Sequence, residues 1–145
     1  TASASAAVGG GATSVGAPTV SMVAAVHSSS MASDSGPRYA GAEAGFIVRG
    51  EGHTLYVSGD TDIMADMGWI GEYYAPDIGI LSAGGHFTMD MKATAWAAQR
   101  FFHFKGVIPA HYKTFPILEQ SADDLIAGLP GVDVNTPEVM ETLAL

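Results

Sequence analysis

Three side chains that could bind a divalent cation each come directly after a predicted strand. They are His27, Asp60 and His111. Active sites in layered α/β sheets collect at strand ends, because the strands are rigid and the loops after them are free to vary. Imidazole and carboxylate are the ligands expected for catalytic Zn²⁺ or Mn²⁺. From spacing alone, the three residues fit either a metal site or a set of structural polar residues.

Hydrophobic periodicity and turn residues predict the elements that must position these side chains. Apolar and β-branched runs predict strands, and apolar residues three and four apart predict helices. The predicted strands are 19–26, 44–49, 54–58, 77–82 and 107–110, with a hairpin turn at 50–53. The predicted helices are 62–74, 90–102 and 121–129, the last with Ser121 as its N-cap. This order predicts an α/β fold, a mixed β-sheet with helices on one face.

The length and composition predict one packed domain. Residues 1–17 are almost entirely Ala, Ser, Gly, Thr and Val, so we expect a flexible segment there and a single domain over 18–145. Charged residues make up only 14% of the chain, below the usual quarter or so of a soluble domain. We therefore expect another chain to cover part of the surface.

Charge and residue usage exclude several functions. Fifteen acidic and six basic residues give a net charge of −9, which argues against a nucleic acid partner. No apolar run reaches the roughly 18 residues of a membrane span, and no signal peptide is recognisable, so we expect a cytoplasmic protein without a membrane partner. The absence of cysteine excludes disulfides, thiolate metal sites and a cysteine nucleophile.

Four short motifs together are specific. They are VHSS at 26–29, SGDTD at 58–62, GGHFTMD at 84–90 and IPAHYKTFP at 108–116. In order and spacing they resemble the metal-dependent hydrolase group of the metallo-β-lactamase superfamily, the group that also contains the L-ascorbate-6-phosphate lactonases. The resemblance implies an αββα sandwich of two similar halves, with a dinuclear metal site at one edge. It also implies that this chain is the C-terminal half of that sandwich.

The same resemblance implies a role for each candidate ligand. The family's N-terminal half supplies four ligands through an HxHxDH signature, and no His-x-His pair occurs in this chain. His27 would complete the first metal, Asp60 would bridge both metals and act in catalysis, and His111 would complete the second. Two divalent ions, Zn²⁺ or Mn²⁺, are the expected cofactors. A hydroxide that bridges them is a nucleophile at neutral pH, because coordination lowers the pKa of water to about 7.

Other histidines are weaker candidates. His86, in the glycine loop, could line the pocket or protonate a leaving group as a second catalytic residue, and a loop histidine bonded to backbone fits as well. His53 is expected to be solvated in its hairpin turn. The helix dipole explains His103, which stands at a helix end.

Two functions from different classes fit these residues. The first is a subunit or fragment of a metal-dependent hydrolase that cleaves a small ester, lactone or cyclic amide. An N-terminal half chain carrying HxHxDH would complete its site in a hetero-oligomer, and the face of this chain that meets that partner should be apolar and include one edge of the site. The second is a non-catalytic binding or regulatory subunit. The presence of all three candidate ligands, His27, Asp60 and His111, which we call the trio, argues against it. A minor third is catalysis by Thr1 as an N-terminal nucleophile. If the chain is part of a metal-dependent hydrolase, the side-chain tips of His27, Asp60 and His111 must lie close together.

Overall fold

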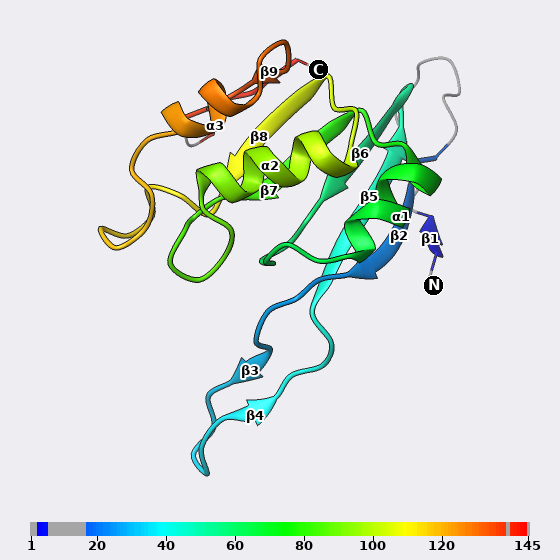
Figure 1. Ribbon diagram of the computed structural model, residues 1–145. Coiled ribbons are helices and arrows are strands. Elements are labelled where there is room, and N and C mark those ends of the chain that lie inside the picture. The colour runs from blue at the N-terminus through cyan, green and yellow to red at the C-terminus, as the bar shows by residue number, and fades with distance from the viewer. Residues whose placement is uncertain (1–2, 6–16, 139, 145) are drawn as a thin grey trace.

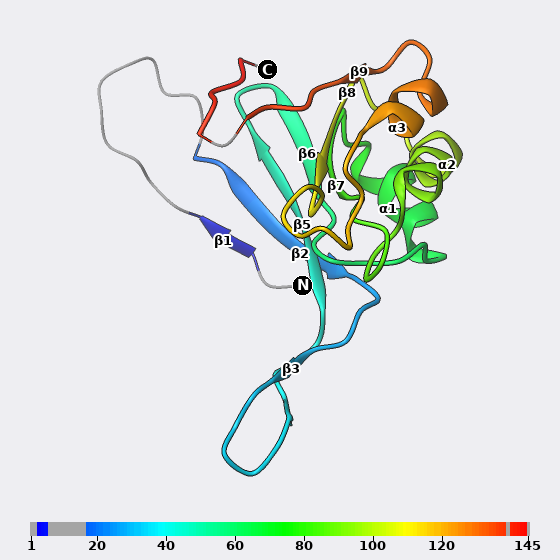
Figure 2. The same cartoon turned by 90° about the vertical axis from the view of Figure 1, so that its left-hand side faces the viewer.

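The computed structural model describes residues 3–5, 17–138 and 140–144. The strands are β1 Ser3–Ser5, β2 Thr19–Ala24, β3 Ser30–Met31, β4 Arg38–Tyr39, β5 Ala44–Gly50, β6 His53–Val57, β7 Ile78–Ser82, β8 Gly106–Ala110 and β9 Asp133–Val134. The helices are α1 Asp66–Tyr74, α2 Met91–Phe101 and α3 Asp123–Gly128. All three helices lie on one face of the large sheet, so the predicted α/β fold is confirmed (Figures 1 and 2).

The large sheet is mixed and has the strand order β1-β2-β5-β6-β7-β8-β9. Pairing is antiparallel from β1 to β6 and parallel from β6 to β9. Consequently β2, β6, β7 and β8 run in the same direction and end at the same edge, which we call the carboxyl edge. The ribbon of β3 and β4 extends away from the sheet at this edge (Figure 1). The loops that carry His27, Asp60, His86 and His111 therefore meet at the carboxyl edge.

The predicted hairpin is confirmed and has a two-residue turn. Glu51 and Gly52 both have positive φ, 53° and 85°. Two-residue hairpin loops with positive φ at both positions follow the right-handed twist of the strands that they join. The turn therefore fixes the register in which Gly50 pairs with His53.

Helix starts differ from the sequence prediction where tertiary hydrogen bonds compete for the backbone. Helix α1 starts at Asp66 and not at 62. The Asp62 carbonyl, which a helix starting there would bond to the Asp66 amide, instead accepts from Thr61 Oγ1 (2.9 Å), and the Asp62 amide donates to the Val26 carbonyl (3.0 Å). Helix α3 has Ala122 and not Ser121 as its N-cap, although Ser121 Oγ accepts a hydrogen bond from the Asp123 amide (3.1 Å). The short strands β3, β4 and β9 were not predicted, since two residues carry no periodic pattern.

Part of the N-terminal segment forms a strand. Ser3–Ser5 pairs with β2 in antiparallel register, where we had expected a flexible chain. Strand pairing at a sheet edge uses backbone groups, so it does not need large side chains. The rest of that segment, residues 1–2 and 6–16, lies outside the described residues, and so does the proposed nucleophile Thr1.

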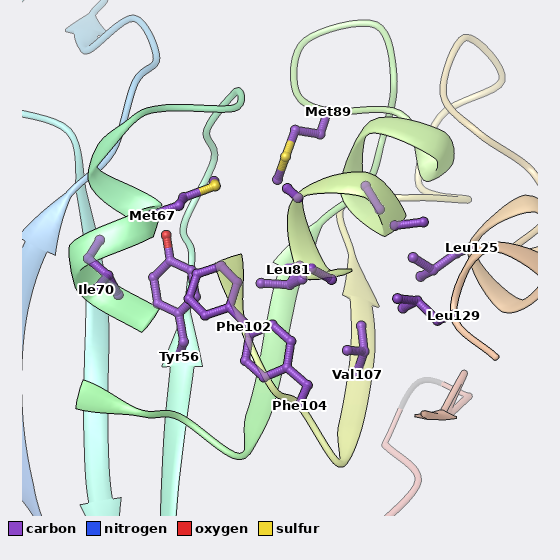
Figure 3. Packing of buried hydrophobic residues seen from close by; sticks show 14 of the residues in the cluster. Tyr56, Met67, Ile70, Leu81, Met89, Phe102, Phe104, Val107, Leu125 and Leu129 are labelled. Carbon is purple, nitrogen blue, oxygen red and sulfur yellow. The ribbon is translucent and has the colours of Figure 1, made fainter. Parts of the chain in front are cut away.

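The core lies between the helices and the sheet. The Tyr56 ring stacks on Phe102 (5.3 Å between ring centroids), and Phe102 stacks on Phe104 (4.6 Å). Met67 and Ile70 of α1 are buried beside this stack (Figure 3). The Tyr56 hydroxyl has no hydrogen-bond partner among the residues that the structure describes, and burial raises the pKa of Tyr56 well above its ordinary value. This packing fixes the helices over the sheet and so fixes the loops between them.

The opposite face of the sheet is apolar. Cross-strand register places Met22, Phe46, Val57, Ile80 and Ile108 in one continuous row from β2 to β8. Met22 is 50% and Phe46 39% exposed, and the other three are half-buried. No described helix lies on this face (Figure 2). We call this row the open face, and an apolar surface of this kind is typical of an interaction site.

None of the helices in the described part of the chain has the length and hydrophobicity needed to cross a bilayer. The cytoplasmic location stays a prediction.

Two glycines of α1 make a matched test of the packing between α1 and α2. A Cβ at Gly71 would overlap the Phe101 carbonyl oxygen, whereas a Cβ at Gly68 would make ordinary contact with the Phe101 ring at 3.8 Å. We expect Gly71→Ala to lower the free energy of unfolding by at least about 2 kcal/mol. Gly68→Ala should raise it by about 0.5–1 kcal/mol, because Ala favours the helix. Urea unfolding of both variants checks this. Equal effects would contradict the close helix contact.

The side chain of Asp77 stabilises the edge of the sheet that lies opposite the carboxyl edge. Asp77 accepts hydrogen bonds from the Thr54 amide (2.8 Å) and from His53 Nδ1 (2.9 Å), so His53 is paired and not simply solvated. Lys105 Nζ lies 3.6 Å from the same carboxylate. Burial alone would raise the pKa of Asp77. The two hydrogen bonds and the attraction of the His53 charge outweigh it and hold this pKa below its ordinary value.

The lowered pKa of Asp77 predicts a dependence of stability on pH. A carboxyl group with a depressed folded-state pKa stabilises the fold above its unfolded pKa of about 3.9, and this contribution is lost as pH falls through the folded pKa. We expect Asp77→Asn to be clearly less stable than wild type near neutral pH, with the difference shrinking below about pH 4. Urea unfolding across that range measures it, with Asp34→Asn on the exposed ribbon as the control. A difference that stays constant with pH would contradict this assignment.

Candidate metal centre

One buried threonine ties together the loops that carry His27 and Asp60. Thr61 is fully buried, and its Oγ1 accepts a hydrogen bond from the Val26 amide (2.9 Å) and donates to the Asp62 carbonyl (2.9 Å). The Asp62 amide in turn donates to the Val26 carbonyl (3.0 Å). The tie joins the residue just before His27 to the residues just after Asp60. The backbones of the two candidate ligands are therefore held side by side.

Further buried hydroxyls extend this tie to β7. The Ser82 amide donates to Ser58 Oγ (2.9 Å), and Ser82 Oγ donates to the Thr61 carbonyl (3.3 Å). Thr94 Oγ1 of α2 donates to the Ser82 carbonyl (3.1 Å), and Thr88 Oγ1 accepts from the Gly84 amide (3.1 Å). We call Ser58, Thr61, Ser82, Thr88 and Thr94 the hydroxyl network. In the described part of the chain, these five are the buried polar residues. The buried hydroxyls thus gather beneath the carboxyl edge and stabilise its loops.

The position of His111 depends on Gly84. A Cβ at Gly84 would overlap the His111 carbonyl oxygen and would lie 3.0 Å from its ring Cδ2. The Glu119 amide donates to the Gly84 carbonyl (2.9 Å), which closes the loop after β8 over the loop after β7. His111 and Lys113 have φ of 61° and 60°, which is strained for residues with a side chain. Such strain is typical of functional sites.

Asp60 depends on a glycine in the same way. Gly59 has φ 64°, and a Cβ there would lie 2.5 Å from the Ala44 carbonyl oxygen. Only glycine therefore lets the chain pass this close to β5 and turn toward the carboxyl edge. The Asp60 side chain is exposed at that edge.

The His27 ring is oriented for a ligand. Its Nδ1 lies 2.9 Å from the Ser28 carbonyl oxygen. A carbonyl can only accept, so Nδ1 carries the hydrogen and the lone pair of Nε2 in the neutral ring is left for a cation. Metal-binding histidines are commonly oriented by a backbone carbonyl in this way.

The side chains of the trio do not form a finished site by themselves. Across residues 3–5, 17–138 and 140–144, no three His, Cys, Asp or Glu side chains come close enough together to hold a metal ion. The expectation that the tips of His27, Asp60 and His111 cluster is therefore not met within this chain. The backbones meet at one edge, where His27 and His111 are half-buried and Asp60 is exposed. Their role as ligands stays a prediction.

His86 lies at the same edge, in the loop after β7. Its side chain is exposed, and its ring packs edge-on against Phe87 with 4.5 Å between centroids. Sequence reasoning missed the hydroxyl network and the two glycines that position the candidate ligands. The motifs SGDTD and GGHFTMD carried a signal for them, because small and hydroxyl residues cluster on both sides of Asp60 and His86.

The tie at Thr61 can be tested with two substitutions. Thr61→Val keeps the shape of the side chain but leaves the part-buried Val26 amide without its acceptor, which costs about 1 kcal/mol. We expect faster hydrogen exchange at the Val26 amide and a change in the NMR signals of the His27 ring. Thr61→Ser retains the hydroxyl and should keep the Val26 amide protected. Unchanged exchange in Thr61→Val would mean that Thr61 does not hold the His27 loop.

Comparison with known proteins agrees with this architecture. No protein-family model matches the chain. A UPF0173 metal-dependent hydrolase of Ruegeria sp. (strain TM1040) is 65% identical over 136 residues, which cover 94% of this chain and 59% of that protein. The chain thus spans less than two thirds of that relative's length.

Solved structures show the same fold. The chain is similar to Igni18, a metallo hydrolase from Ignicoccus hospitalis, with a TM-score of 0.71 and 29% identity over 87% of this chain and 52% of that one. The metallo-β-lactamase fold protein YhfI from Bacillus subtilis has a TM-score of 0.57 and 11% identity over 82% of this chain and 47% of that one, a likeness of fold alone. The chain is therefore similar in sequence to UPF0173 metal-dependent hydrolases, and its fold matches about half of solved proteins with a metallo-β-lactamase fold.

Proposed function

We propose that this chain is part of a metal-dependent hydrolase in which His27, Asp60 and His111 bind two divalent ions. The observation that carries the proposal is that all three follow strands ending at the carboxyl edge, where the hydroxyl network and Gly84 hold their loops together. Two imidazoles and one carboxylate are suitable donors for Zn²⁺ or Mn²⁺. The close relation to UPF0173 metal-dependent hydrolases supports the same chemistry.

The remaining ligands, in this proposal, come from residues outside this chain. Two ions need more donors than the trio offers, and the described residues hold no preassembled group of three. The open face is an apolar surface to which a second sheet layer could bind. A partner half that carries HxHxDH fits this requirement, either as a separate chain in a hetero-oligomer or as part of the same polypeptide.

The proposed reaction is hydrolysis of a small ester, lactone or cyclic amide. Bound divalent ions supply Lewis acidity and lower the pKa of water. The oxygen of water bonds to the carbonyl carbon, the bond to the leaving oxygen or nitrogen breaks, and that atom takes a proton. Asp60 contributes the negative charge that holds the site together. In this proposal, His86, which is exposed at the same edge, gives the leaving group its proton.

One observation favours the alternative of a non-catalytic binding or regulatory subunit. This is the lack of a preassembled ligand group among the described residues. The two functions differ in metal content, since a regulatory subunit has no need of ions held by Asp60.

Substitution of the proposed ligand and of the proposed acid separates their roles. In the complete metal-loaded enzyme, we expect Asp60→Asn to lower kcat/KM by at least about 1000-fold and to reduce the metal content, because a bridging charge is lost. His86→Ala should lower kcat/KM by about 100-fold, as loss of a general acid does, and leave the metal content intact. His103→Ala, at the far end of α2, is the control. Full metal content in Asp60→Asn would support the regulatory alternative.

A further inference from the structure

Five large, partly exposed apolar side chains stand in the loops that carry the candidate ligands. Val26, Ile63, Phe87, Phe115 and Ile117 are each between 38% and 60% exposed. They belong to the four loops that follow β2, β6, β7 and β8, and therefore lie at the carboxyl edge (Figure 1). These loops are the same ones that carry His27, Asp60, His86 and His111. We call the five side chains the apolar rim.

The loops have no packing reason to expose these side chains. The hydroxyl network, the Gly84 contact and the strained residues His111 and Lys113 fix the loop backbones. Isolated exposed apolar residues are normal, but a set that surrounds polar groups at one site is typical of ligand binding. Small-molecule sites are lined mainly by apolar and aromatic side chains around a few polar groups. The apolar rim and the candidate ligands bring both kinds of side chain to the same four loops.

The charges of the same loops argue against an anionic ligand. Segments 25–29, 58–65, 83–90 and 111–122 contain four carboxylates, Asp60, Asp62, Asp90 and Glu119, and a single Lys or Arg. That cation, Lys113, lies over the ring of its neighbour Tyr112 at 5.4 Å from the centroid. The two ions of the proposed site would attract an anion that reached them. A phosphate or sulfate group that lies away from the scissile bond instead needs convergent cationic or amide donors, and these loops offer it one lysine among four carboxylates.

We propose that the substrate of this site is a neutral carboxylic ester or lactone with an alkyl or aryl group beside the scissile bond. The inference rests on the proposed function and specifies its substrate. The apolar rim holds the alkyl or aryl group, and His86, packed against Phe87, faces the leaving oxygen. Water adds to the carbonyl carbon, the ester C–O bond breaks, and the leaving alcohol takes the proton. A phosphorylated sugar lactone does not fit the rim or its charge.

Binding can be tested without turnover. Acetanilide is a neutral amide that resembles phenyl acetate and resists hydrolysis. In NMR titrations of the complete metal-free protein, where phosphate has no ions to coordinate, we expect acetanilide to shift the signals of Phe87, Phe115 and Ile117, and inorganic phosphate to leave them in place. Shifts confined to other surfaces, or phosphate binding at the rim, would overturn the inference.

Turnover gives the second test. For phenyl butyrate, we expect Phe87→Ala and Phe115→Ala to raise KM by about 10-fold with little change in kcat. Trp96→Ala, on the exposed side of α2, is the matched control, because it removes an aromatic side chain that is 52% exposed away from the rim. Thermal unfolding of each variant shows that the fold is retained. A phosphorylated sugar lactone should be hydrolysed at least about 10-fold less efficiently than phenyl butyrate.

The outcomes separate the two proposals. If the metal-loaded enzyme hydrolyses no ester, lactone or amide, the proposed function fails. If it prefers the phosphorylated lactone, or if Trp96→Ala changes KM as much as Phe87→Ala, the apolar substrate class fails while the hydrolase function stands.

Discussion

The hydroxyl of Thr61 joins two loops that are 35 residues apart in sequence, and the carboxyl edge depends on that contact. A buried hydroxyl without partners is costly, so Thr61 stabilises the structure only when both loops are in place. Ser58 and Ser82 extend the same constraint to the next strand. Because hydrogen bonds join Thr61 to Val26, Ser82 to Thr61 and Ser82 to Ser58, the loops after β2, β6 and β7 are held in one arrangement. The fixed loops place His27 and Asp60 together.

The sheet separates two kinds of surface. The helix-covered face is packed around Tyr56, Phe102 and Phe104, and its contacts hold the strands in register. The open face presents apolar residues without a helix over them. Helices cover one face of this sheet, and its carboxyl edge carries candidate ligands that do not form a complete group. Both features are expected for one layer of a two-layer site. The open face and the unfinished metal centre therefore have one explanation in the proposed partner half.

Much of the fold could be predicted because it rests on local patterns. The strands of the sheet centre are rich in apolar and β-branched residues, and the glycines on both sides of Glu51 mark a tight turn. The start of α1 could not be predicted, because the Asp62 amide bonds to Val26 from a distant part of the chain. Short β9 has too few residues for a pattern. Periodicity reports local burial and does not report which distant backbone group competes for a hydrogen bond.

The candidate site was predictable in its residue types and their edge, and not in its side-chain geometry. Strand ends placed His27, Asp60 and His111 at one edge, as the parallel direction of β2, β6 and β8 requires. The glycines Gly59 and Gly84 matter for close approaches that only three-dimensional structure shows. The described side chains form no preassembled group of three ligands, because the direction of the strands fixes where each loop begins and does not fix where its side-chain tip points.

The most direct test of the proposed metal centre is anomalous X-ray diffraction at the zinc and manganese absorption edges from crystals of the complete metal-loaded protein. We predict two anomalous peaks about 3.5–4 Å apart at the carboxyl edge. Asp60 should contact both ions, His27 one and His111 the other. Peaks elsewhere in the protein, or ions bound at this edge without contact to these three side chains, would contradict the proposed site.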